Sequence, residues 1–131
     1  MKRLLAACAL ILTLGACAPA PGGGPTFRPP PVCWKYPANP ANVAVQLSIQ
    51  QAFGPYGQAV VDQAGRVACC ESGWGPQAVN GQYRGLFQLG YNYNGTIAFY
   101  GGAVFDPFTN TQVARDSWVT RGGWAAFACK P

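Results

Sequence analysis

The stretch QAVVDQAGRVACCE, residues 58–71, carries the clearest periodic pattern in this chain. At about 100° per residue, its apolar side chains fall on one side of a helix, with Asp62 and Arg66 on the opposite side. Glu71 falls within about 20° of Val60, in the middle of the apolar stripe and on the last turn before Gly73. We therefore predict a helix over residues 58–71 that presents one carboxylate to the protein interior.

Glu71 is the only glutamate in the chain, and its predicted place suits acid chemistry. Burial disfavours a charged carboxylate, and so do the unpaired carbonyls at a helix C-terminus. A carboxyl group that keeps its proton near neutral pH is what glycosidic bond cleavage needs from a general acid. The alternative is an ordinary last-turn glutamate that bends out to water, and the helix pattern alone favours that alternative.

The composition excludes several other kinds of site. The chain has 131 residues, four Asp or Glu, nine Lys or Arg and no histidine, and only 10% of its residues are charged. Without histidine there is no Ser-His-Asp triad, no Cys-His pair and no histidine-bound zinc or haem. We predict neither a metal site nor a cofactor, so acid–base chemistry must use very few groups.

The N-terminus has the form of an export signal. Two basic residues precede an apolar run at residues 4–14, which is too short to span a membrane comfortably. Residues 14–17 (LGAC) resemble a bacterial lipobox, which implies that residues 1–16 are a signal peptide and that Cys17 is lipidated. Ala18 then implies an outer-membrane lipoprotein facing the periplasm, by resemblance to Gram-negative lipoproteins. The alternative is ordinary signal cleavage after residues 18–20 (APA).

The remaining chain divides into a tether and one domain. Residues 17–31 are rich in Pro and Gly and predict a tether, and residues 32–131 form the domain. The chain beyond the signal keeps seven basic and four acidic residues, a net charge of +3. Because the basic residues are scattered, we predict no nucleic-acid partner. We expect a monomer held at the membrane by its lipid.

Other segments of the domain predict a mainly α fold. Residues 42–53 and residues 109 or 110 to 121 read as helices ended by glycine, and residues 80–81 (NG) can close a small hairpin. Residues 91–95 (YNYNG) read as a polar loop. The apolar tail at residues 124–129 is expected to pack on the core. We therefore predict a compact helical domain with a short hairpin or loop region after the Glu71 helix.

The cysteines predict two disulfides, because Cys33, Cys69, Cys70 and Cys129 are an even number in an exported domain. The adjacent Cys69 and Cys70 point about 100° apart on a helix, so a bond between them is disfavoured. Cys70 flanks the apolar stripe that the C-terminal tail can reach, and Cys69 faces the polar side. We predict the pairs Cys70–Cys129 and Cys33–Cys69.

Five segments, in this order, resemble the lysozyme-like superfamily and, within it, small lytic transglycosylase domains. They are residues 70–73 (CESG), 76–80 (PQAVN), 85–89 (GLFQL), 106–114 (DPFTNTQVA) and 123–124 (GW). The resemblance implies an α+β lysozyme-like fold and peptidoglycan glycan strands as the substrate.

The resemblance also assigns roles to individual residues. It implies that Glu71 is the catalytic acid at the bond between N-acetylmuramic acid and N-acetylglucosamine. It further implies that Ser72 supports Glu71 and that Gln88 lies in the glycan cleft. Nearby aromatic residues are candidates for stacking on sugar rings: Tyr83, Phe87, Tyr91 and Tyr93.

The acids favour one reaction outcome over another. Glycoside hydrolases commonly use two carboxylates, but residues 73–105 contain no Asp or Glu. A lytic transglycosylase uses one glutamate, first as acid and then as base, and leaves a 1,6-anhydro end. We therefore expect a lytic transglycosylase. A lysozyme-type muramidase and a non-catalytic glycan-binding lipoprotein remain the alternatives.

Overall fold

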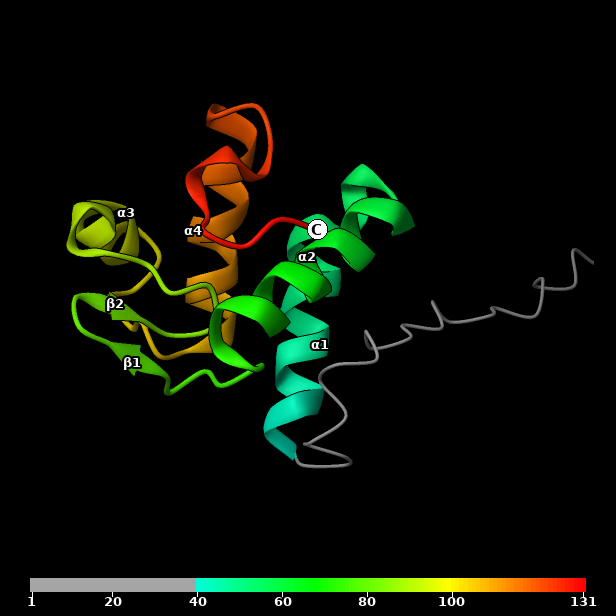
Figure 1. Cartoon of the computed structure of the whole chain (residues 1–131). Helices are drawn as coiled ribbons and strands as arrows, with labels where there is room; N and C mark the ends of the chain where they lie inside the picture. Colours follow the sequence, from blue (N-terminus) through cyan, green and yellow to red (C-terminus); the bar gives the residue numbers. More distant parts are fainter. Residues whose placement is uncertain (1–39) are drawn as a thin grey trace, which may run out of the picture.

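The computed structural model describes residues 40–131, and within that range the chain forms four α-helices and one antiparallel hairpin (Figure 1). In chain order the elements are α1 (Pro40–Phe53), η2 (Gly54–Tyr56), α2 (Gln58–Ser72), β1 (Val79–Asn80), β2 (Tyr83–Arg84), η3 (Tyr91–Tyr93), α3 (Asn94–Phe99), α4 (Pro107–Thr120) and η4 (Trp124–Ala126). The prediction of a mainly helical domain with a short hairpin after the Glu71 helix is confirmed.

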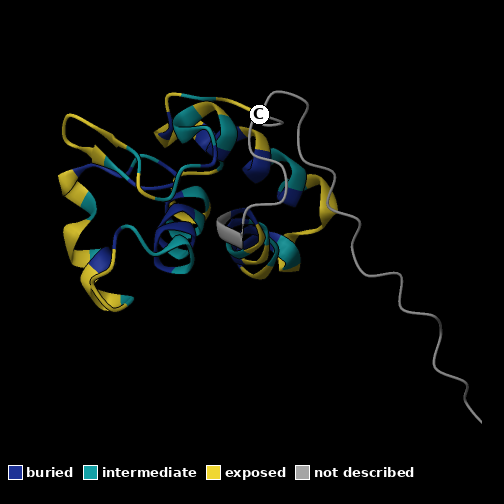
Figure 2. Cartoon of the chain, turned by 90° about the horizontal axis from the view of Figure 1, so that it is seen from below, coloured by how far each residue is buried: buried dark blue, intermediate teal, exposed yellow. Residues whose placement is uncertain are grey.

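Helix α1 lies at the centre of the fold, between α2 and α4. Its side chains Val45, Ile49 and Phe53 are fully buried. Ser48 on the same helix contacts the Thr111 hydroxyl of α4 at 3.0 Å, which satisfies two buried hydroxyls at once. Figure 2 shows the buried positions of the helices facing one another, with the exposed positions turned outward.

Helix α2 follows the predicted apolar stripe. Val61, Ala64, Val67 and Ala68 are buried. Gly73, in the left-handed conformation at φ 62°, ends the helix and donates its N–H to the carbonyl of Cys69 at 2.7 Å. The helix is therefore one residue longer than predicted, and Glu71 lies on its last turn.

Helix α4 begins earlier than the sequence pattern predicts. Asp106 is its N-cap, and the Oδ2 of that residue accepts the N–H of Thr109 at 2.8 Å. Pro107 occupies the first helical position, where its missing N–H is not needed. The predicted helix start at Thr109 or Asn110 was wrong, because the first turn of α4 is defined by its cap and not by a pattern of apolar residues.

Residues 91–95 are not a polar loop. Tyr91–Tyr93 form the 3-10 turn η3, and Asn94 and Gly95 are the first residues of α3. Only Ile97 of α3 is buried. A six-residue helix with one buried side chain leaves no periodic signal in the sequence, which explains why it was not predicted.

The C-terminal tail packs on the core as predicted, through aromatic rings. The Trp124 ring lies 5.4 Å from that of Phe53 and 5.5 Å from that of Phe127. Trp124 also donates its indole N–H to the side-chain Oε1 of Gln63 on α2 at 3.0 Å. These contacts hold the tail against α1 and α2.

Cys70 and Cys129 form a disulfide that joins α2 to the tail, which confirms that predicted pair. The reasoning behind it was partly wrong, because Cys70 is exposed while Cys69 is half-buried against the core. Cys69 is disulfide-bonded too, but its predicted partner Cys33 lies outside the described residues. The predicted signal peptide, Cys17 and the tether also lie outside them. In the described part, no helix has the length and apolar character to cross a membrane.

Candidate active site

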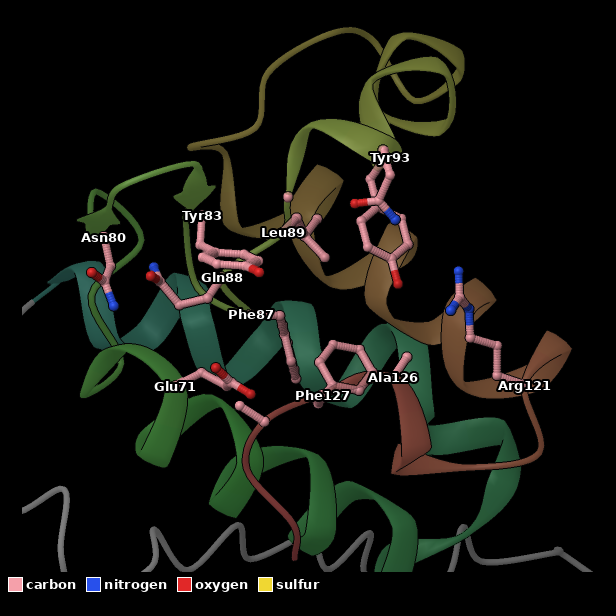
Figure 3. A pocket seen from close by; sticks show the side chains of 13 residues that line it. Glu71, Asn80, Tyr83, Phe87, Gln88, Leu89, Tyr93, Arg121, Ala126 and Phe127 are labelled. Atoms are coloured by element: carbon pink, nitrogen blue, oxygen red, sulfur yellow. The ribbon is translucent and has the colours of Figure 1, made fainter.

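Glu71 lies on the wall of a cleft with a volume of about 550 Å³ (Figure 3). The opposite wall comes from the hairpin and from the segment that follows it, and the tail closes one side. The cleft is lined by Glu71, Asn80, Tyr83, Phe87, Gln88, Leu89, Gly90, Asn92, Tyr93, Arg121, Ala126, Phe127 and Ala128. This volume lies within the usual range for small-molecule sites.

The Glu71 carboxylate is half-buried and has a fixed partner. Its Oε1 accepts a hydrogen bond from the backbone N–H of Cys129 at 2.9 Å. Cys129 is also bonded through its side chain to Cys70, the residue before Glu71. The acid is therefore held between its own helix and the tail, and the alternative of a solvent-directed glutamate does not describe this geometry.

Among the described residues, no second carboxylate lines the cleft, and each of the other three acidic side chains has a hydrogen-bond partner elsewhere. Asp62 accepts the side-chain amide of Gln58 at 2.9 Å on the exposed face of α2. Asp106 caps α4. Asp116 accepts the hydroxyl of Tyr100 at 2.6 Å. The site therefore offers one carboxylate for chemistry.

Asp116 belongs to a small polar cluster beside the cleft. Arg115 donates to Asp116 at 2.8 Å and to the hydroxyl of Tyr100 at 3.1 Å. The hydrogen bond from Tyr100 to Asp116, followed by burial, raises the pKa of Tyr100 above its ordinary value of 10.0. Both oxygens of the Asp116 carboxylate therefore accept hydrogen bonds, one from Tyr100 and one from Arg115.

The cleft wall at residues 85–89 is held by Asn110, a fully buried residue of α4. Its Oδ1 accepts the N–H of Phe87 at 2.8 Å, and its Nδ2 donates to the carbonyl of Val104 at 2.8 Å. Gly85 allows this close approach, because a Cβ there would lie 2.2 Å from the Asn110 Nδ2. The glycine and the asparagine together place this wall opposite Glu71.

Gln88 has a strained backbone in the middle of that wall. Its φ of 50° is left-handed, which costs a residue other than glycine roughly 1–2 kcal/mol. Its Nε2 donates to the carbonyls of Gly85 at 2.9 Å and Ala78 at 3.3 Å. These bonds hold the side chain at the cleft surface, on the wall opposite Glu71 (Figure 3).

Ser72 does not line the cleft; its hydroxyl instead connects two of the segments that form the cleft walls. Its hydroxyl donates to the carbonyl of Leu86 at 2.7 Å and lies 3.1 Å from the carbonyl of Ala68. The bond to Leu86 ties the end of α2 to the wall at residues 85–89. Ser72 therefore sets the spacing between Glu71 and Gln88 rather than contacting the carboxylate.

The predicted aromatic residues divide into two groups. Tyr83 and Tyr93 line the cleft, and Tyr83 is 45% exposed. Phe87 also reaches the cleft, but it is 1% exposed and belongs mainly to the core. Tyr91 does not line the cleft; it is 55% exposed, and the guanidinium of Arg84 lies 4.7 Å from its ring centre.

Two parts of the site were not found from the sequence. Asn80 lines the cleft from the hairpin; it ends the segment at residues 76–80, but we predicted no role for it. Arg121, the residue after α4, also lines the cleft and stands in no motif. The tail residues at 126–128 form a wall only because the disulfide and the rings bring them back over α2. Long-range contacts of this kind leave no local sequence signal.

A second hollow of about 420 Å³ adjoins the first, and Asn92, Tyr93 and Arg121 line both. Asp116 lines the second hollow but not the first.

Comparisons of the chain with protein-family models, with curated proteins and with solved structures found no match.

Proposed function

We propose that this protein is a lytic transglycosylase that cleaves the β-1,4 bond between N-acetylmuramic acid and N-acetylglucosamine in peptidoglycan. The observation that carries the proposal is the single carboxylate of Glu71, half-buried and oriented in a cleft of about 550 Å³. The lysozyme-like fold suggested by the sequence belongs to the same proposal. It is supported by the placement of residues 85–89 opposite Glu71.

The proposed reaction uses Glu71 twice. Its Oε2 first donates a proton to the glycosidic oxygen, and the bond from that oxygen to C1 of the muramic acid breaks. The resulting carboxylate then takes the proton from the C6 hydroxyl of the same sugar while the C6 oxygen bonds to C1. The products are a 1,6-anhydro end and a free 4-hydroxyl, and no water is consumed.

The hydrogen bond to Cys129 fits both halves of this cycle. An N–H group donates to Oε1 whether the carboxyl group is protonated or charged, so this bond need not break between the two steps. Oε2 is then the oxygen left to carry the proton.

The shape of the site supports a polymeric substrate. The two hollows share lining residues, so a strand of several sugars can lie along both. Tyr83 and Tyr93 offer ring faces, and Gln88 and Asn80 offer amide groups for acetamido substituents. Lipid attachment at Cys17 would place the domain at the outer membrane, facing the cell wall.

The absence of a second carboxylate favours this reaction over a lysozyme-type hydrolase. Retaining glycosidases place their two carboxyl groups about 5–5.5 Å apart and inverting ones about 6.5–9.5 Å apart. Asp62, Asp106 and Asp116 do not line the cleft that holds Glu71. Asp116 lines the second hollow, where it is bonded to Arg115 and to the Tyr100 hydroxyl.

The experiment follows the turbidity of purified sacculi with the full chain, with Glu71→Gln and with Asp62→Asn. The two variants make the same change from carboxylate to amide on one helix, but only Glu71 lines the cleft. We expect wild type and Asp62→Asn to clear the suspension and Glu71→Gln to be slower by at least 10³-fold, an order of magnitude typical for a lost catalytic acid.

Equal clearing by wild type and Glu71→Gln would overturn the role of Glu71. A Glu71→Gln protein that binds sacculi, beside a wild type that releases no fragments, would favour the non-catalytic binding protein.

A further inference from the structure

We infer that the Cys70–Cys129 disulfide is a control point of the cleft, because it holds the backbone N–H that orients Glu71. Its reduction by a dithiol would release this N–H and lower activity. The inference rests on the proposed function for its effect on rate, but the positioning itself is measured without activity.

The disulfide and the acid are coupled through neighbouring residues. The bridge joins Cys70, which directly precedes Glu71, to Cys129, whose N–H donates to the Glu71 Oε1 at 2.9 Å. One residue thus supplies both the covalent anchor and the hydrogen bond. Ala128, the residue before Cys129, lines the cleft.

The rest of the tail has its own anchors, so loss of the bridge has a local effect. Trp124 and Phe127 are buried, at 7% and 6% exposure, and Trp124 is bonded to Gln63. The ammonium group of Lys130 donates to the carbonyls of Trp124, Ala125 and Phe127, which gathers the tail into a turn around its own backbone. These contacts hold residues 124–127 on the core, whereas Ala128 is exposed and lies next to the bridge. Without the bridge, residues 128–131 keep the Lys130 bonds and the packing of the half-buried Cys129 against the core, but the covalent link between the Cys129 N–H and the helix that carries Glu71 is lost.

The bridge is also open to exchange with a dithiol, because Cys70 is exposed. A thiolate of the dithiol attacks one sulfur, the Cys70–Cys129 bond breaks, and a mixed disulfide forms. The second thiol of the reagent then displaces the remaining cysteine. The bridge gains two electrons and two protons and becomes two thiols, while the dithiol is oxidised to a disulfide.

The activity experiment compares the full chain before and after dithiothreitol with two double variants, Cys70→Ser/Cys129→Ser and Cys33→Ser/Cys69→Ser. The second pair removes the other predicted bridge and keeps the bond beside Glu71.

We expect reduced wild type and Cys70→Ser/Cys129→Ser to lose at least tenfold in kcat on sacculi. Cys33→Ser/Cys69→Ser should keep its activity until dithiothreitol is added. A Cys70→Ser/Cys129→Ser protein with the rate of wild type would overturn the inference.

Hydrogen exchange at the Cys129 amide tests the positioning without any substrate. We expect this amide to be protected in the oxidised protein and at least tenfold less protected after reduction, while the buried amides of α1 stay protected. Equal protection in both forms would overturn the inference. If the exchange pattern is as expected and no form cleaves sacculi, the proposed function fails and the positioning role of the bridge stands.

Discussion

The side-chain Oδ1 of Asn110 accepts the backbone N–H of Phe87 at 2.8 Å, across 23 positions of sequence. This bond fixes the cleft wall to α4, which packs on α1. The carboxylate on the opposite wall is fixed by a different pair, Glu71 and Cys129. The cleft is therefore framed by two long-range hydrogen bonds to backbone N–H groups, one on each side.

Asn110→Ala should lower the free energy of unfolding by about 3 kcal/mol. The substitution removes the side-chain partners of the Phe87 N–H and the Val104 carbonyl, which are both buried. Urea unfolding followed by circular dichroism measures this loss. Asn94→Ala is the control, since it removes only an exposed hydrogen bond from Arg84 and should change stability by less than about 0.5 kcal/mol. Equal stability of the two variants would contradict the assigned role of Asn110.

Gly85→Ala should lower the free energy of unfolding by about 3 kcal/mol or more. The Cβ of the new alanine would lie 2.2 Å from the Asn110 Nδ2 and 2.6 Å from the Val104 carbonyl oxygen. Gly81→Ala is matched in backbone conformation, at φ 60°, but has open space around it. It should lose only the conformational cost of about 1 kcal/mol. Thermal unfolding of the two variants compares them directly, and a smaller loss for Gly85→Ala would refute the close approach.

Ser72→Ala should lose about 1–2 kcal/mol of stability and also lower the rate on sacculi, because the end of α2 is no longer tied to the Leu86 carbonyl. Ser48→Ala removes a buried hydroxyl between α1 and α4 that does not line the cleft. We expect a similar loss of stability there with the rate unchanged. A rate for Ser72→Ala equal to that of Ser48→Ala would show that the tie does not affect the site.

The raised pKa of Tyr100 implies that the free energy of unfolding depends on pH at alkaline pH. Its pKa is raised in the folded protein by the hydrogen bond to Asp116, so the folded state holds this proton more tightly than the unfolded state. The contribution is complete below pH 10 and is lost as the pH rises through the raised folded-state pKa. The difference in unfolding free energy between wild type and Tyr100→Phe should therefore be constant from pH 8 to about 10 and shrink above it. A constant difference up to pH 11.5 would contradict this.

The sequence predicted the local parts of the structure better than the long-range ones. The apolar stripe at residues 58–71 was sufficient for α2, since burial of one face determines that helix. It also placed Glu71 correctly at the helix end. By contrast, α3 has one buried residue and no periodic pattern, so it was missed.

The frame of the site depends on pairings that no local pattern contains. The sequence gives no reason for the Cys129 N–H, rather than a side chain, to bond Glu71. Asn110 lies within a segment noted for its resemblance, but the hydrogen bonds of its side chain depend on the fold, which brings Arg84, Phe87 and Val104 to it. The angle between adjacent helical residues argued only against a Cys69–Cys70 bond. Cys129 was chosen for Cys70 because Cys70 was expected beside the buried stripe, so the pair was predicted correctly although the burial of Cys70 was misjudged.

We propose that Glu71 acts alone as the acid and base of a lytic transglycosylase. Mass spectrometry of the muropeptides released from sacculi by the wild-type chain and by Glu71→Gln tests this role. We expect the wild type to release 1,6-anhydro-muramic ends, each about 18 Da (one water) lighter than the hydrolysed end, and Glu71→Gln to release almost none. Release of reducing ends alone by the wild type would contradict the transglycosylase reaction, and equal release by Glu71→Gln would contradict the role of Glu71.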